Sequence, residues 1–199
     1  MADVSLEPAT KRMGELVHAI PDDRLDARTP SDCAVGALLD HVQTLAQAFA
    51  KAAAKINDVT TSAPPPPPDA ARLGDDWRER IPQLLDGLAA AWNDPAAWQG
   101  MTKVGGMDMP GEVVGVVALD EVVLHSWDLA VAIGQRYDPP AELLPLLVPF
   151  LKHVAEPGME AARSGLFGPV VTVPDGAPLF DRVLGLAGRD PNWTATDDT

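Results

Sequence analysis

Apolar residues recur every three or four positions along most of the chain, which is the spacing of helices that bury one face. The pattern predicts helices over residues 5–20, 29–55, 69–92, 110–134 and 138–154, and a short last one over 179–186. Strand-like alternation of apolar and polar residues is scarce before residue 165. We therefore expect an all-α main domain.

Proline and glycine indicate where these helices are interrupted. Five consecutive prolines at residues 64–68 lack amide donors and favour an extended conformation. We interpret them as a spacer between helices rather than as a ligand for a proline-recognition domain. Pro82 is expected to kink or split the third helix. Residues 95–110, rich in glycine, methionine and proline, predict an ordered loop with room for a short hairpin.

The last part of the chain has a different pattern. Residues 169–174, PVVTVP, are typical of a short strand, and a helix is expected after them. We predict a helical domain over residues 1–160 and a small α+β C-terminal appendage over residues 161–199.

Charge and composition exclude several classes of protein. The 199 residues carry 15 Lys+Arg against 29 Asp+Glu, a formal net charge of −14, which excludes a nucleic-acid binder that neutralises phosphates. No window approaches the roughly 20 apolar residues of a membrane span, and no secretory leader is apparent, so we expect a cytoplasmic protein. Cys33 is the single cysteine, so a metal would be held by histidines and carboxylates.

The predicted fourth helix contains the most informative side chains. Its sequence, GEVVGVVALDEVVLHSWDLAVAIG, is apolar almost all round, which is typical of a buried helix. Glu121, His125 and Asp128 share one sector of roughly 60°, whereas Asp120 points nearly the opposite way. A carboxylate and an imidazole in apolar surroundings are unfavourable unless they are paired or bind a metal.

His41, on the flank of the apolar stripe of the second helix, can complete such a site. His41, Glu121 and His125 form a set of two histidines and one carboxylate, which is typical of a divalent metal site with positions open to water or substrate. The alternative is a buried ion pair between Glu121 and His125, with His41 at the surface. The residues alone leave both interpretations open.

Three segments carry a resemblance to a known family. "RTPSDCAVGALLDHV", "DEVVLHSWDLAVAIGQ" and "GPVVTVPDGAPLFDRVLGLAGRDP" resemble, in this order, the DinB/YfiT superfamily of metal-binding proteins, near the actinobacterial mycothiol-dependent maleylpyruvate isomerases. The resemblance implies a four-helix bundle and a divalent metal ion held by His41, Glu121 and His125. We expect this ion to be zinc, with nickel as the alternative. Members of this branch commonly have a tryptophan near the start of the second helix, where this chain has Cys33.

Several other residues have two interpretations. Asp128 is either a hydrogen-bond acceptor that orients His125 or a buried group bonded to the backbone. Cys33 is a small packing residue or, at a helix N-terminus that would lower its pKa, a reactive thiol. Arg163 and Arg182 are surface partners of acidic residues or a clamp for a substrate carboxylate. We expect His18 and His153 to lie outside the metal site.

Two functions follow from the resemblance. The first is a metal-dependent enzyme that uses a low-molecular-weight thiol such as mycothiol in an isomerisation or transfer reaction on a small electrophile. The sequence does not identify this electrophile. The second is a non-catalytic metal-binding bundle with a regulatory or interaction role, for which a fourth protein ligand would close the site. Association into a homodimer is compatible with either function.

Overall fold

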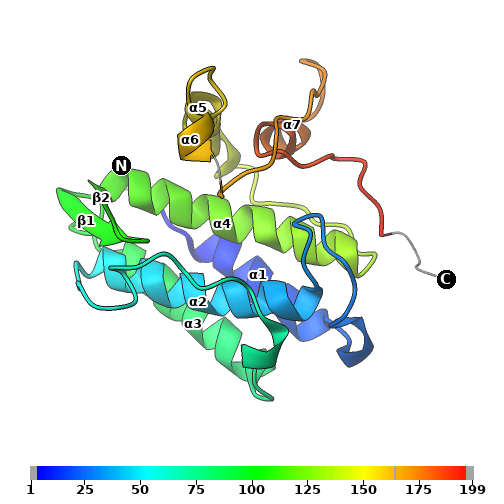
Figure 1. Cartoon of the computed structure of the whole chain (residues 1–199), viewed down its shortest axis with the longest axis horizontal. Helices are drawn as coiled ribbons and strands as arrows, with labels where there is room; N and C mark the ends of the chain where they lie inside the picture. Colours follow the sequence, from blue (N-terminus) through cyan, green and yellow to red (C-terminus); the bar gives the residue numbers. More distant parts are fainter. Residues whose placement is uncertain (1–3, 164, 196–199) are drawn as a thin grey trace. The chain divides into compact units, whose positions relative to one another are not determined.

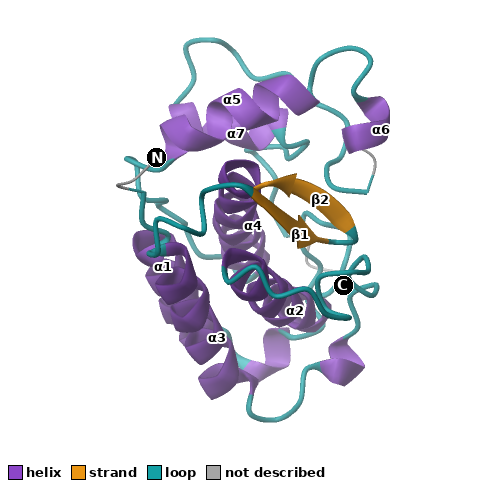
Figure 2. Cartoon of the chain, turned by 90° about the vertical axis from the view of Figure 1, so that its left-hand side faces the viewer, coloured by secondary structure: helices purple, strands orange, loops and turns teal. Residues whose placement is uncertain are grey.

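The computed structural model of the chain describes residues 4–163 and 165–195, and it is mostly helical, as predicted. The chain divides into two compact units, residues 1–137 and 138–199. The elements of each unit are shown in Figures 1 and 2. None of the described helices is both long and apolar enough to cross a membrane.

Four long helices make up most of the first unit. α1 packs against α3 and α4, and α2 packs against the same two helices, so that their apolar stripes face a common interior. Figure 1 shows α2 and α4 side by side. The helices span α1 Glu7–Ala19, α2 Val35–Ala53, α3 Trp77–Trp92 and α4 Gly111–Ala132, and a 3₁₀ turn follows α1 at Asp22–Arg24.

Helix α4 is as buried as its sequence indicates, with 16 of its 22 residues buried. Gly115 allows a close approach to the rings of two tryptophans. A Cβ atom at this position would lie 2.5 Å from Cζ3 of Trp98 and 2.8 Å from Cζ3 of Trp92. After α4, Gly134 adopts the left-handed conformation that a residue just past a helix end requires, with φ of 73°.

Helix α2 begins at Val35, six residues later than the predicted start at Thr29. The residues before it form a closed loop, in which the Thr29 hydroxyl donates to the Cys33 carbonyl oxygen at 2.8 Å. Asp32 has φ of 59°, a conformation outside the right-handed helical region. The loop therefore replaces the first turns that the sequence pattern predicted.

Helix α3 also begins later than predicted. Asp69 caps only a 3₁₀ turn, Ala70–Arg72, by accepting a hydrogen bond from the Ala71 amide. Gly74 then leaves the helical conformation with φ of 71°, and α3 starts at Trp77. Pro82 does not split α3, which continues to Trp92. The prolines at 64–68 are exposed and without regular structure, in the connection that follows α2.

The short hairpin allowed for residues 95–110 is present. β1 (Met101–Val104) pairs antiparallel with β2 (Met107–Pro110), with Val104 opposite Met107. Gly105 and Gly106 both have positive φ, as a two-residue hairpin turn requires. The Thr102 hydroxyl donates to the Ala52 carbonyl oxygen at 2.6 Å, which fixes the hairpin to the end of α2.

The second unit contains α5 (Leu144–Val154), α6 (Glu160–Arg163) and α7 (Leu179–Leu186). Residues 138–160 therefore belong to the same unit as the end of the chain, whereas the sequence suggested a boundary after residue 160. Within this unit, α5 packs against α7. The strand predicted at 169–174 is absent from the described residues of this unit. The segment has no regular structure, and its Val171 amide donates to the Gly185 carbonyl oxygen of α7, at 2.9 Å, rather than to a neighbouring strand.

Candidate metal centre

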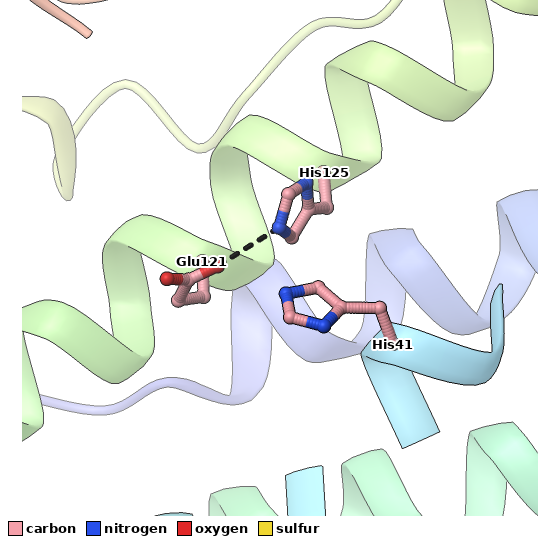
Figure 3. A group of neighbouring side chains, drawn as sticks. All are labelled: His41, Glu121 and His125. Atoms are coloured by element: carbon pink, nitrogen blue, oxygen red, sulfur yellow. Dashed lines mark ion pairs between the residues drawn. The ribbon is translucent and has the colours of Figure 1, made fainter. Parts of the chain in front are cut away.

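Three side chains from two helices converge inside the first unit. His41 comes from α2, and Glu121 and His125 come from consecutive turns of α4. Each offers one ligand atom, and these atoms lie within 4.8 Å of one another. Figure 3 shows one ring nitrogen of His41 directed toward the other two side chains. The structure thus brings together the three residues that the sequence singled out.

Glu121 and His125 form a direct pair because residues four apart stack on one face of a helix. Oε2 of Glu121 lies 2.8 Å from Nε2 of His125. The Glu121 side chain keeps 18% of its surface exposed and the His125 side chain 9%, so the pair lies at the edge of the core with Glu121 nearer to solvent.

Asp128 holds the other side of the His125 ring. Its Oδ2 lies 3.0 Å from Nδ1 of His125, and the Asp128 side chain is completely buried. This arrangement favours the interpretation of Asp128 as the acceptor that orients His125. The same Oδ2 accepts a hydrogen bond from the Ser31 hydroxyl at 2.6 Å. Ser31 was not predicted as a site residue, because its one signal in the sequence is its place in the segment before α2.

The two carboxylates change the protonation of His125. Burial lowers the pKa of its imidazole, but the hydrogen bonds and charges of Asp128 and Glu121 outweigh burial and raise the pKa to about 9. The pKa of His41 is lowered, by burial first and by the neighbouring His125 second. In the absence of a metal, His125 is therefore the charged imidazole of the cluster at neutral pH, and His41 is the neutral one.

His41 contributes a second imidazole beside His125. Its ring meets that of His125 edge to face, with centroids 5.3 Å apart. Its Nδ1 is buried and has no hydrogen-bond partner. The preceding residue, Asp40, fixes this part of α2 through an ion pair with Arg72 at 2.8 Å. A rigid helix thus presents a neutral imidazole to the Glu121–His125 pair.

The donor set fits a divalent metal ion. Two imidazoles and one carboxylate are the ligands that zinc takes in sites with an open position. A recess beside Glu121 and His125 is otherwise lined by apolar side chains from all four helices, among them Met13, Phe49, Leu85 and Ala118. Apolar walls exclude water and strengthen the electrostatic interactions of the cluster.

The other histidines lie elsewhere, as expected. His18 is exposed on α1, and His153 lies 3.5 Å from Glu156 in the second unit. Within residues 4–163 and 165–195, no fourth histidine, cysteine or carboxylate joins the three candidate ligands. On the protein side, the candidate centre therefore has three ligands.

The other residues considered from the sequence, Arg163, Arg182 and Cys33, are not among the three candidate ligands. Arg163 is buried, and it donates from Nε to the Gly168 carbonyl oxygen and from Nη2 to the Leu186 carbonyl oxygen, so it is not a surface partner of acids. Arg182 is half-buried in α7. Burial raises the pKa of the Cys33 thiol, and the nearby Asp128 and Asp32 add to this, although a hydrogen bond between the thiol and the Thr29 hydroxyl acts in the opposite direction. This favours Cys33 as a packing residue over a reactive thiol.

Comparison with known proteins adds one match. The mycothiol maleylpyruvate isomerase N-terminal domain family matches residues 6–130, which span α1 to α4 and include His41, Glu121 and His125. Searches of curated proteins and of solved structures each gave no match. Because the matched region exceeds half of the chain, the protein belongs to this DinB-like family.

Proposed function

We propose that His41, Glu121 and His125 hold a divalent metal ion, with zinc preferred to nickel as its identity. We further propose that this centre binds a low-molecular-weight thiol of the mycothiol type, which reacts with a small electrophile. The observation that carries the proposal is the convergence of three ligand atoms within 4.8 Å from α2 and α4. Membership of a mycothiol-related family supports the choice of thiol.

The number of protein ligands supports a reactive rather than a structural centre. Structural zinc sites have four protein ligands, whereas catalytic sites have three and leave a position for water or substrate. Among the described residues only three ligands come together. A purely structural role, which would need a closed site, is therefore the weaker candidate.

Each side chain of the proposed site has a different role. His41 and His125 supply neutral nitrogens, and Glu121 supplies a negative charge that offsets part of the charge of a bound cation. Asp128 accepts the hydrogen of His125 Nδ1 and thereby keeps Nε2 available to the site. A divalent ion bound there would act as a Lewis acid and hold a thiol in its deprotonated form.

The proposal is tested with cobalt(II) as a spectroscopic substitute for zinc. We expect the cobalt-loaded protein to develop a sulfur-to-cobalt charge-transfer band when mycothiol or a simpler thiol is added. Glu121→Ala and His41→Ala should lose the band together with bound cobalt, whereas His18→Ala, a histidine outside the cluster, should keep both.

Two results would contradict parts of this account. If cobalt binds but no thiol changes its spectrum, the site is closed to thiols, and a regulatory or interaction role is the better account. If cobalt does not bind to the wild-type protein, the metal centre itself is wrong. Thiol-dependent loss of small electrophiles, measured afterwards, would identify the substrate class.

A further inference from the structure

The loop that precedes α2 reaches the centre with the hydroxyl of Ser31. Ser31 lies 97 positions before Asp128 in the sequence, yet its Oγ is 2.6 Å from Oδ2 of that carboxylate. Ser31 is half-buried, and Asp128 is completely buried in α4. A hydrogen bond between a hydroxyl and an ionised carboxylate is among the stronger kinds, and 2.6 Å is typical of it.

Ser31 and His125 donate to the same oxygen atom. Oδ2 of Asp128 receives the Ser31 hydroxyl at 2.6 Å and faces Nδ1 of His125 at 3.0 Å. The terminal torsion of an aspartate side chain is soft, so each hydrogen bond to the carboxylate limits its rotation. The Ser31 hydroxyl adds such a restraint on the oxygen that faces His125, and it thereby helps to set the orientation of the His125 ring.

We propose that Ser31 is a positioning residue of the metal centre, which acts through Asp128 to hold His125 with Nε2 toward His41 and Glu121. The inference rests on the metal site proposed above. Ser31 does not touch the ion in this account. Its hydroxyl reduces the freedom of one ligand before the ion arrives, and such preorganisation strengthens metal binding.

The loop is closed by bonds that do not involve the Ser31 hydroxyl, which allows a role at Asp128 to be separated from a role in loop structure. Thr29 closes the loop with two bonds to the Cys33 carbonyl oxygen, from its amide at 2.9 Å and from its hydroxyl at 2.8 Å. Arg28 and Asp32 form an exposed ion pair across the same loop at 2.6 Å. Thr29→Val, which removes the hydroxyl bonds to Cys33 and keeps the amide bond, is therefore a matched control that perturbs the loop without removing a bond to Asp128.

The experiment measures cobalt(II) affinity and the cobalt absorption spectrum of four full-length proteins: wild type, Ser31→Ala, Ser31→Thr and Thr29→Val. Partners of metal-bound histidines typically contribute a factor of about 10 to 100 in affinity. Because Ser31 acts one bond further out, we expect Ser31→Ala to weaken binding about tenfold and to change the visible bands of cobalt. Ser31→Thr, which keeps the hydroxyl, should restore both.

The outcomes separate this inference from the metal site itself. Wild-type affinity and an unchanged spectrum in Ser31→Ala would overturn the role of Ser31 while leaving the three ligands in place. An equal loss in Thr29→Val would also overturn it, because the effect would then come from the loop. If the wild-type protein binds no cobalt, the proposed function is wrong and the role of Ser31 at a metal centre is overturned with it. Thermal unfolding of each variant confirms that the compared proteins are folded.

Discussion

Nε2 of His125 lies 2.8 Å from Oε2 of Glu121, one helical turn away on α4. With Asp128 on the opposite side of the ring, the imidazole is held between two carboxylates in a mostly buried position. The residues alone allow two accounts of such a pair, an ion pair or part of a metal site, and the family resemblance implies the second. Both accounts involve the same atoms, because a metal ion would take the place of the proton on Nε2.

The stability of the metal-free protein should fall as the pH rises. The pKa of His125 is about 9 in the folded protein and about 6.5 in an unfolded chain. A group whose pKa is raised by folding stabilises the folded protein in full at pH values below its unfolded-state pKa. This contribution is lost as the pH rises through its folded-state pKa. We expect a loss of about 3 kcal/mol between pH 6.5 and 9.

Urea denaturation in the presence of a chelator measures this pH dependence. His125→Gln, which lacks the titrating group, is the matched control and should show a flatter profile over the same range. A wild-type profile as flat as that of the variant would mean that His125 is not held charged by the two carboxylates.

Removal of the Asp128 carboxylate should destabilise the fold. Asp128→Ala leaves the Ser31 hydroxyl and Nδ1 of His125 without their shared acceptor at a buried position. Breaking such a pair typically lowers the free energy of unfolding by about 3 kcal/mol. Asp128→Asn keeps an oxygen acceptor and should lose less. Equal stability of Asp128→Ala and wild type in chemical denaturation would argue against this network.

Cys33 should react slowly with alkylating reagents at neutral pH. Burial and the nearby Asp128 and Asp32 raise the pKa of its thiol, so the reactive thiolate is scarcer than in an ordinary cysteine. The rate of iodoacetamide labelling should rise only above the ordinary pH range of a free thiol. Cys33→Ser should retain full metal content. Fast labelling at pH 7, or metal loss in this variant, would revive a functional role for the thiol.

Two glycine substitutions should have opposite effects on stability. Gly115→Ala places a Cβ atom 2.5 Å from the Trp98 ring, and overpacking of this kind lowers stability by about 1–3 kcal/mol. Gly87, inside α3, has no atom within 4 Å of the equivalent position. Gly87→Ala should therefore stabilise by about 0.5–1 kcal/mol through helix propensity. Thermal or chemical unfolding measures both, and a stabilised Gly115→Ala would contradict the packing of α4.

Helical periodicity predicted the part of the site that lies within one element. Glu121, His125 and Asp128 fall on one face of α4 because residues three and four apart do so in any helix. His41, on the flank of the apolar stripe of α2, was open to two interpretations, a ligand or a surface residue, and the structure places it beside the other two side chains. The contribution of Ser31 was missed because it comes from an irregular loop, whose path is set by Thr29 and Asp32 rather than by a repeating pattern.

The strand predicted near Val171 is not formed, for a different reason. Alternating valines indicate a propensity for extended structure, but a strand also needs a neighbouring strand to pair with, and this segment lies against α7 instead. The hairpin at 101–110 formed where Gly105 and Gly106 supply the left-handed turn. Local turn residues were the better guide to β-structure in this chain.

Elemental analysis of the purified, untagged protein tests the metal centre most directly, because it requires no assumption about substrate. After loading with divalent ions and dialysis, we predict close to one zinc or nickel ion per chain in the wild-type protein and in His153→Ala. His41→Ala, Glu121→Ala and His125→Ala should each retain almost none. A wild-type protein without metal, or full metal content in any of the three variants, would contradict the assignment of His41, Glu121 and His125 as ligands.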